Sequence, residues 1–208
     1  TGVPDSLLKN FCAYVTDTAP EDKHIIAANE GCALALASGY HLATGKTPVV
    51  YMQNSGLGNA ANPLLSLADS DVYSVPLVLL IGWRGMPAVH DEPQHIKQGK
   101  VTLALLDAMR IPYVVTAESE DELNKQIDYC YACTEKASAP FAFVVKKDTF
   151  APYALKNKTS SDAEMTREDA IERIVLHSPK DAVFVSTTGM ASRELFELRV
   201  KHGMSGAN

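Results

Sequence analysis

The sequence has few cysteines, one tryptophan and no long apolar run. Four scattered cysteines in 208 residues are too few to form a disulfide scaffold, which predicts a reducing, cytoplasmic location. The longest apolar candidate, residues 75–82, contains Pro76 and falls well short of the roughly 20 residues that cross a bilayer. We therefore expect neither a disulfide-stabilised fold nor a membrane segment.

Basic residues are in the minority. The chain has 19 lysines and arginines against 25 aspartates and glutamates, so its formal net charge is -6. A field of that sign repels phosphate backbones and anionic membrane surfaces. We expect no nucleic-acid partner and no membrane partner.

Metal sites and serine-hydrolase sites lack their characteristic residues. Cys130 and Cys133 form a C-x-x-C, but their segment has helical apolar spacing, and no second cysteine or histidine pair completes a zinc site. His90 and His95 are separated by a proline and have no cysteine nearby. No G-x-S-x-G motif is present. We expect packed helical thiols and no metal ligand within these residues.

Short apolar runs alternate with helical stretches along residues 1–146. Runs without polar alternation that are separated by helices are typical of buried parallel strands. We therefore predict an α/β fold, an open and mostly parallel sheet covered by helices on both faces. The expected strands are residues 24–28, 47–53, 77–81, 113–116 and 141–145. The expected helices are residues 5–15, 30–44, 60–69, 94–109 and 120–136, with loops at 54–59 and 83–93.

The pattern changes after residue 146. Residues 147–165 have lysines, sequence breakers and no periodic apolar face, which predicts a linker. Residues 166–208 then give an expected helix at 166–177, a strand at 182–185 and a helix at 191–200. Because one such unit cannot bury both faces of a sheet, we expect the start of a second α/β domain, either truncated or continued on a separate chain.

Candidate functional residues follow the predicted strands, where open parallel sheets place their chemistry. Glu30 comes directly after the strand at 24–28, and the two glycines of residues 54–59 allow a close backbone approach to a ligand. Asp5 and Ser6 precede the first helix. Each has a structural alternative, a helix cap for the three polar residues and a tight turn for the glycines.

The loop after the strand at 77–81 is the densest in titratable groups. It and the start of the next helix hold Arg84, His90, Asp91, Glu92, Gln94 and His95. A long loop of this composition is more often functional than a plain connector. The alternative is that Arg84 pairs with Asp91 or Glu92 and only holds the loop.

Four motifs in a fixed order carry a resemblance. They are G-V-P-D-S at 2–6, N-E-G at 29–31 before an alanine-rich helix, Q-N-S-G-L-G-N at 53–59, and R-G at 84–85 followed by D-E-P-Q-H at 91–95. Together they resemble the thiamine-diphosphate-dependent 2-oxoacid decarboxylases. On this resemblance residues 1–146 form the pyrimidine-binding domain, and S-T-T-G-M at 186–190 resembles the opening of the diphosphate-binding domain.

The resemblance implies a role for each candidate residue. Glu30 falls on the catalytic glutamate of the family, which shares a proton with a ring nitrogen of the cofactor's aminopyrimidine. The implied cofactor-binding residues are Glu30, Asn54, Gly56, Thr188 and Gly189. The implied substrate-binding residues are Asp5, Ser6, Arg84, Gln94 and His95.

The resemblance also implies partners and a reaction. The cofactors are thiamine diphosphate and Mg2+, and the metal-binding motif of the family lies beyond the end of this chain. Because the family's cofactor lies between two subunits, the implied assembly is a homodimer or a higher homo-oligomer. The implied reaction converts phosphonopyruvate to phosphonoacetaldehyde and carbon dioxide. Sulfopyruvate or another 2-oxoacid stays open as substrate, and a non-catalytic α/β ligand-binding module stays open as the rival from another class.

Overall fold

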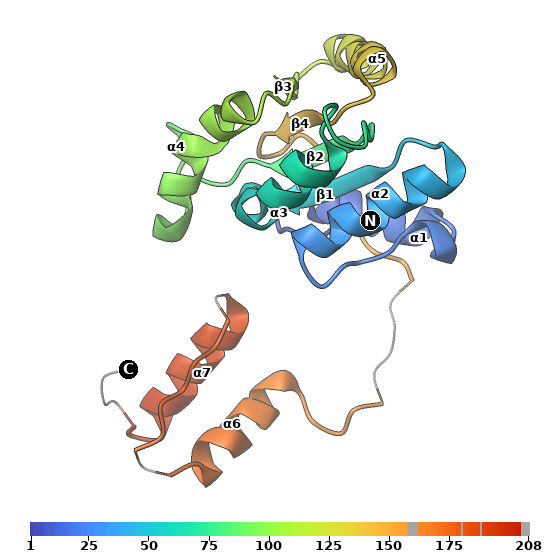
Figure 1. Cartoon of the computed structure of the whole chain (residues 1–208). Coiled ribbons are helices and arrows are strands. Elements are labelled where there is room, and N and C mark those ends of the chain that lie inside the picture. Colours follow the sequence, from blue (N-terminus) through green and yellow to red (C-terminus); the bar gives the residue numbers. More distant parts are fainter. Residues whose placement is uncertain (158–161, 180, 188, 205–208) are drawn as a thin grey trace. The chain divides into compact units, whose positions relative to one another are not determined.

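The computed structural model describes residues 1–157, 162–179, 181–187 and 189–204. The chain divides into two compact units, Thr1–Asn157 and Lys158–Asn208 (Figure 1). The larger unit is an α/β structure with a sheet at its centre. The smaller unit is built around two helices.

The described sheet of the first unit has four parallel strands in the order β1-β2-β4-β3. Their bounds are Val49–Gln53 for β1, Val78–Gly82 for β2, Tyr113–Val115 for β3 and Phe141–Val145 for β4. The register pairs Gln53 with Gly82 and Gly82 with Val145, so the carboxyl ends of β1, β2 and β4 are level. The loops that follow these strands therefore start at one edge of the sheet.

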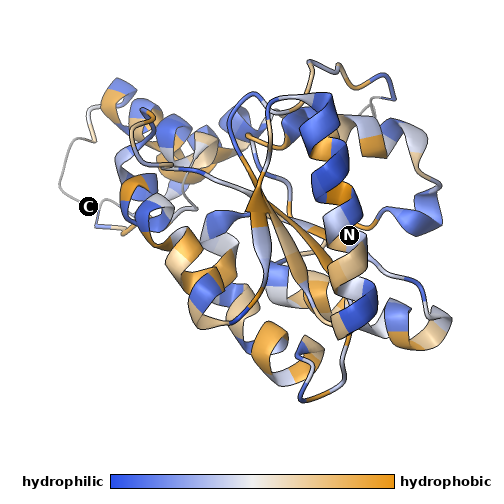
Figure 2. Ribbon diagram, turned by 90° about the horizontal axis from the view of Figure 1, so that it is seen from above, coloured by the Kyte–Doolittle hydropathy of each residue, from blue (hydrophilic) through white to orange (hydrophobic). Residues whose placement is uncertain are grey.

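Helices cover both faces of this sheet, as the sequence predicts. Ala142 and Val144 of β4 lie in one core, which includes residues of α2 (Glu30–Thr44), α3 (Leu57–Pro63) and α4 (Pro93–Ala108). Phe141 and Phe143 lie in a second core, with residues of α1 (Lys9–Thr18) and α5 (Glu120–Ala137). Figure 2 shows the hydrophobic strands between the helices.

α2 has the bounds that the sequence predicts. Asn29 caps its first turn by accepting a hydrogen bond from the backbone N–H of Cys32 at 2.9 Å. Gly45 ends the helix in the left-handed conformation, with φ 70°. Both signals are local in the sequence, which is why the helix could be read from it.

Two elements near the predicted strand ends differ from expectation. α1 begins at Lys9 rather than at residue 5, because residues 6–8 form a turn and Asp5 accepts the Leu7 N–H at 3.0 Å. The predicted loop at 54–59 is also wrong. A 3-10 turn, η2 (Asn54–Gly56), leads directly into α3, and a π-helical turn, η3 (Leu64–Ala68), follows. Because Pro63 has no N–H to donate, the α-helical ladder is interrupted there.

The predicted strand at 24–28 is reduced to one bridge. Gly2 pairs in parallel with Ile26 on one side and with Tyr51 on the other. Two hydrogen bonds join Gly2 to this segment, from Ala27 N–H at 2.9 Å and to the Ile25 carbonyl at 3.3 Å. A strand needs a ladder of such partners, and Gly2 alone does not provide one.

The second unit contains α6 (Arg167–His177) and α7 (Met190–Lys201). Thr166 and Asp169 form the capping box predicted from their spacing, with Asp169 N–H donating to the Thr166 hydroxyl at 3.2 Å. The predicted strand at 182–185 is wrong. The segment has no strand partner among the described residues, and Val183 and Val185 are 82% and 93% exposed.

Candidate active site

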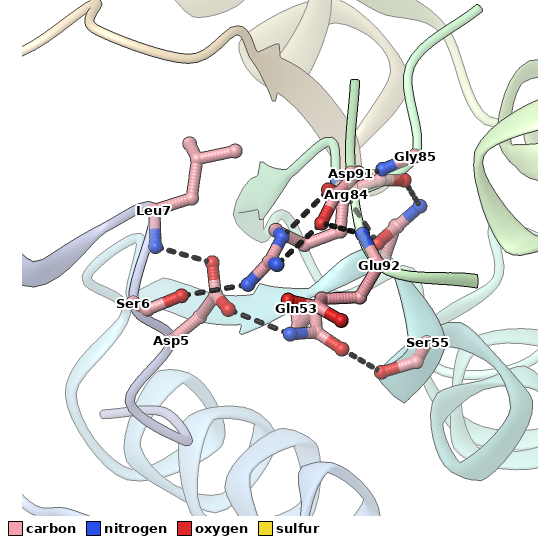
Figure 3. Close-up of polar contacts among 10 residues, drawn as sticks. Asp5, Ser6, Leu7, Gln53, Ser55, Arg84, Gly85, Asp91 and Glu92 are labelled. Carbon is pink, nitrogen blue, oxygen red and sulfur yellow. Dashed lines mark hydrogen bonds and ion pairs between the residues drawn. The ribbon is translucent and has the colours of Figure 1, made fainter. Parts of the chain in front are cut away.

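Three of the predicted segments meet at the carboxyl edge of the sheet. Residues 5–6, residues 53–55 and the loop from Arg84 to Asp91 are joined by side-chain hydrogen bonds (Figure 3). Glu30 lies beside the second of these segments, against Gly56. The edge therefore brings together carboxylates, amides and a guanidinium from segments far apart in the sequence.

Glu30 is the first residue of α2 and is half-buried. Its Oε2 accepts a hydrogen bond from Asn59 Nδ2 at 2.8 Å. Its side chain lies against Gly56, where a Cβ atom would come within 2.5 Å of Glu30 Cγ and 2.7 Å of Oε1. Oε1 itself has no hydrogen-bond partner within the described part of the chain. One oxygen is therefore held in place while the other is available to a ligand.

Asn59 is a residue that the sequence analysis did not assign. It lies in the Q-N-S-G-L-G-N motif, which is the sequence signal that could have identified it. In the structure α3 places it next to α2. Gly31 permits this approach, since a Cβ atom there would lie 3.2 Å from the Asn59 carbonyl oxygen. The amide of Asn59 thus orients the carboxylate of Glu30.

Asn54 is 1% exposed and its side chain is fully engaged by the protein. Nδ2 donates to the Arg84 carbonyl and to Thr102 Oγ1, both at 2.8 Å, and Oδ1 accepts from Arg84 N–H at 3.2 Å. Both amide hydrogens are used, so this side chain has none to give a cofactor. Its role as a cofactor contact stays a prediction, and its side-chain amide hydrogens are not available for that role. Asn54 instead ties the turn after β1 to the loop after β2 and to α4.

Asp5 is 7% exposed and lies at the centre of the polar network. Oδ1 accepts from Gln53 Nε2 at 2.7 Å, and Oδ2 accepts from Leu7 N–H at 3.0 Å. Ser55 donates a hydrogen bond from its hydroxyl to Gln53 Oε1 at 2.6 Å, which extends the chain of hydrogen bonds into the turn after β1 (Figure 3). Asp5 does not cap α1, whose N-cap is Leu8; it stabilises the turn before that helix and belongs to the buried network.

Arg84 and Asp91 form a two-pronged ion pair. Arg84 Nε donates to Asp91 Oδ2 at 2.8 Å, and the NH2 nitrogen donates to Oδ1 at 2.5 Å. The guanidinium and two backbone N–H groups, from Gly85 and Glu92, hold the pKa of the Asp91 carboxyl well below its usual range. The Asp91 carboxylate in turn raises the pKa of Arg84. The ion pair between Arg84 and Asp91, one of the alternatives that the sequence leaves open, is therefore present.

The third nitrogen of Arg84 reaches the turn before α1. NH1 donates to the Ser6 hydroxyl at 2.7 Å. This bond links two residues predicted to bind substrate. Three N–H donors of the Arg84 guanidinium are therefore used in hydrogen bonds within the protein.

Gln94 and His95 lie in the first turn of α4. Gln94 is exposed and His95 is partly exposed, and neither side chain is hydrogen-bonded to the network within the described residues. Gly189, at φ 102°, precedes α7 in the second unit. Thr188 lies outside the described residues.

Among the described residues, no group of three histidine, cysteine, aspartate or glutamate side chains is placed to hold a metal ion. None of the described helices is long and apolar enough to cross a membrane.

Residues 1–109 match the family model described as the thiamine pyrophosphate enzyme, N-terminal TPP binding domain. The chain belongs to the thiamine pyrophosphate enzyme family. Thiamine pyrophosphate is the same compound as thiamine diphosphate, so the expected family and cofactor are confirmed. The matched range includes Glu30 and every predicted substrate residue.

Relatives of this family agree on decarboxylation and differ in substrate. A phosphonopyruvate decarboxylase from Streptomyces viridochromogenes is 35% identical over 213 residues, 95% of this chain and 52% of the relative. The sulfopyruvate decarboxylase subunit alpha of Methanocaldococcus jannaschii is 34% identical over 145 residues, 68% of this chain and 80% of the relative. The chain thus spans about half the length of the first relative and most of the second.

A solved structure supports the fold. The benzoylformate decarboxylase from Polynucleobacter necessarius matches with a TM-score of 0.51 at 19% identity, over 84% of this chain and 32% of that one. The expected α/β architecture is confirmed by this likeness and by the parallel sheet.

Proposed function

We propose that the full-length protein catalyses the thiamine-diphosphate-dependent decarboxylation of phosphonopyruvate to phosphonoacetaldehyde and carbon dioxide. The observation that carries this proposal is the Glu30 carboxylate, held between Asn59 and Gly56, with Oε1 bonded by none of the described residues. The similarity to the Streptomyces phosphonopyruvate decarboxylase supports the choice of substrate.

Glu30 is the residue that shares a proton with the cofactor. Asn59 fixes Oε2, so Oε1 is the oxygen that would meet a ring nitrogen of the aminopyrimidine. The amino-terminal end of α2 favours a negative charge at this position. When bound, thiamine diphosphate supplies a cationic ring that accepts the electron pair left by the departing carbon dioxide. The residues of this chain position the proton donor.

The other residues of the network hold the substrate side of the site. Asp5, buried and fixed by Gln53, orients the segment that carries Ser6. Arg84, neutralised by Asp91, holds the loop before α4. Gln94 and His95 in the first turn of that helix are candidates for contact with the substrate carboxylate, because a helix amino terminus attracts anions.

The second unit belongs to the diphosphate-binding half in this proposal. Thr188 and Gly189 would lie near the diphosphate, and Mg2+ would be held by residues outside the 208. Because the cofactor needs both halves, the working protein would be a homodimer or a higher homo-oligomer.

A second candidate is sulfopyruvate decarboxylation. It is favoured by the match to a separate alpha subunit, of which this chain covers 80%. In that case a second polypeptide would complete the site.

Carbon dioxide release from phosphonopyruvate, sulfopyruvate and pyruvate, measured side by side with thiamine diphosphate and Mg2+, tests the proposal. We expect the highest kcat/KM with phosphonopyruvate. A preference for sulfopyruvate would select the second candidate. Absence of carbon dioxide from all three, with thiamine diphosphate bound, would favour a non-catalytic binding module.

A further inference from the structure

A cavity of about 270 Å3 opens beside Arg84. It lies among α1, the loop after β2 and the turn after β4. Its polar lining includes Ser6, Lys9, His90 and Lys147, and its apolar lining includes Trp83 and Phe150. None of these residues except Ser6 was assigned a role above.

The free positive charge of this cavity comes from its two lysines. Arg84 is neutralised by Asp91, which also lines the cavity. Lys9 and Lys147 form no ion pair with any described residue. One further acid, Asp148, faces them. The neighbouring Lys146 is excluded, because it pairs with Glu118 at 2.9 Å.

Ser6 adds a hydrogen-bond donor. Its hydroxyl oxygen accepts from Arg84 NH1 at 2.7 Å, so its own hydrogen points elsewhere. No described residue accepts that hydrogen. A hydroxyl in this state can donate to an anion in the cavity.

The walls of the cavity are held together without a ligand. Asn10 Nδ2 donates to the Phe150 carbonyl, and Tyr153 N–H donates to Asn10 Oδ1, both at 3.3 Å. The rings of Phe11 and Phe150 pack with centroids 5.5 Å apart. The segment after β4, which carries Lys147, is thus fastened to α1, which carries Lys9.

The floor of the cavity is apolar. Trp83 is 8% exposed, and its ring N–H donates to the Gly99 carbonyl at 2.8 Å, which fixes the ring. Lys9 and Lys147 are themselves exposed, so they supply charge to the cavity from its solvent side.

We propose that this cavity binds the second anionic group of the substrate, a tetrahedral phosphonate or sulfonate. Lys9 and Lys147 supply charge, and Ser6 supplies a hydrogen bond. The cavity thereby selects 2-oxoacids with a second anion over pyruvate. The proposal rests on the proposed function, since it assumes that the reacting carbonyl lies at the same edge of the sheet.

The first test measures selectivity in the full-length protein with thiamine diphosphate and Mg2+. Lys9→Met with Lys147→Met removes both charges and retains side-chain length. We expect the KM for phosphonopyruvate to rise about tenfold or more, which corresponds to losing charge-assisted contacts, and the KM for pyruvate to change less than about twofold. Lys100→Met, an exposed position on α4 outside the cavity, controls for net charge and should change neither. Equal changes for both substrates would overturn the proposal.

The second test needs no turnover. Methylphosphonate, methanesulfonate and acetate are titrated into the full-length protein and followed by calorimetry. We expect methylphosphonate and methanesulfonate to bind more tightly than acetate, and the double lysine variant to lose that preference. The tighter of these two ligands shows whether the cavity prefers a phosphonate or a sulfonate. If binding follows this pattern but no 2-oxoacid is decarboxylated, the proposed function fails and the anion site stands. If the protein decarboxylates phosphonopyruvate but the double lysine variant keeps the same anion binding and substrate selectivity, the anion site is wrong and the proposed function stands.

Discussion

Asn59 donates a hydrogen bond from its side-chain amide to Glu30 Oε2 at 2.8 Å across the α2–α3 contact, and no described residue bonds Oε1. This relationship defines which oxygen of the catalytic carboxylate meets the cofactor in our account. It also makes Asn59 a positioning residue whose role can be tested separately from that of Glu30.

Replacing Asn59 by alanine should lower kcat/KM for decarboxylation about tenfold, because one hydrogen bond to the carboxylate is lost. Rescue by added thiamine diphosphate should be partial, since Glu30 stays in place but turns more freely. Asn62→Ala is the matched control on the same helix, where Asn62 accepts only a hydrogen bond from Ser66. Similar losses in both variants would show that α3, not the carboxylate, is affected.

Gly56→Ala should weaken cofactor binding at least about tenfold. The new Cβ atom would lie within 2.5 Å of Glu30 Cγ, so the carboxylate must move. Gly58→Ala is the control, because a Cβ atom at Gly58 meets nothing within 4 Å. That substitution should be neutral for binding and stabilise α3 by up to about 1 kcal/mol. Thiamine diphosphate affinity by calorimetry and thermal unfolding measure the two effects, and equal affinities in the two variants would contradict the packing of Glu30 on Gly56.

Asp91→Asn should destabilise the first unit by about 2 kcal/mol at pH 7, because Arg84 loses its partner in a partly buried pair. The pKa of Asp91 is lowered in the folded protein, so its contribution is fully present above the ordinary aspartate value of about 3.9 and is lost as pH falls toward the lower folded value. The stability difference between the proteins should therefore be constant from pH 7 to about pH 5 and shrink below about pH 4.

Urea unfolding followed by fluorescence measures this difference. Trp83, the single tryptophan, lies in the first unit and reports on it alone. A stability gap that widens as the solution is acidified would contradict the assigned direction of the Asp91 shift.

The sequence predicts the sheet and most helices because their signals are local. The runs that became β2 and β4 are apolar on both sides, and α2 has its cap and its glycine stop next to it. The segments at 24–28 and 182–185 are also mostly apolar, but neither has a ladder of strand partners among the described residues, which a local pattern does not reveal. Strand formation is a property of pairs of segments.

The candidate site also combines residues with local sequence signals and contacts that depend on the fold. Glu30 and Gly56 were identified from their motifs, but their contact arises from the packing of α2 on α3. The engagement of Asn54 depends on Thr102, which is 48 residues away, so no spacing rule could indicate it. Arg84 and Asp91 are close enough in sequence for their pairing to be weighed in advance. The cavity with Lys9 and Lys147 joins residues from opposite ends of the first unit and could only be found in the structure.

The most direct test of the central claim is the rate of carbon dioxide release from phosphonopyruvate by the full-length Glu30→Gln variant, saturated with thiamine diphosphate and Mg2+. Glutamine keeps the shape and the contact with Asn59 but cannot share a proton in the same way. We expect a loss of about 100- to 10,000-fold in kcat, the usual scale for a proton-transfer group, with the fold and the occupancy of the cofactor unchanged. Turnover close to that of the unmodified protein would contradict the assignment of Glu30.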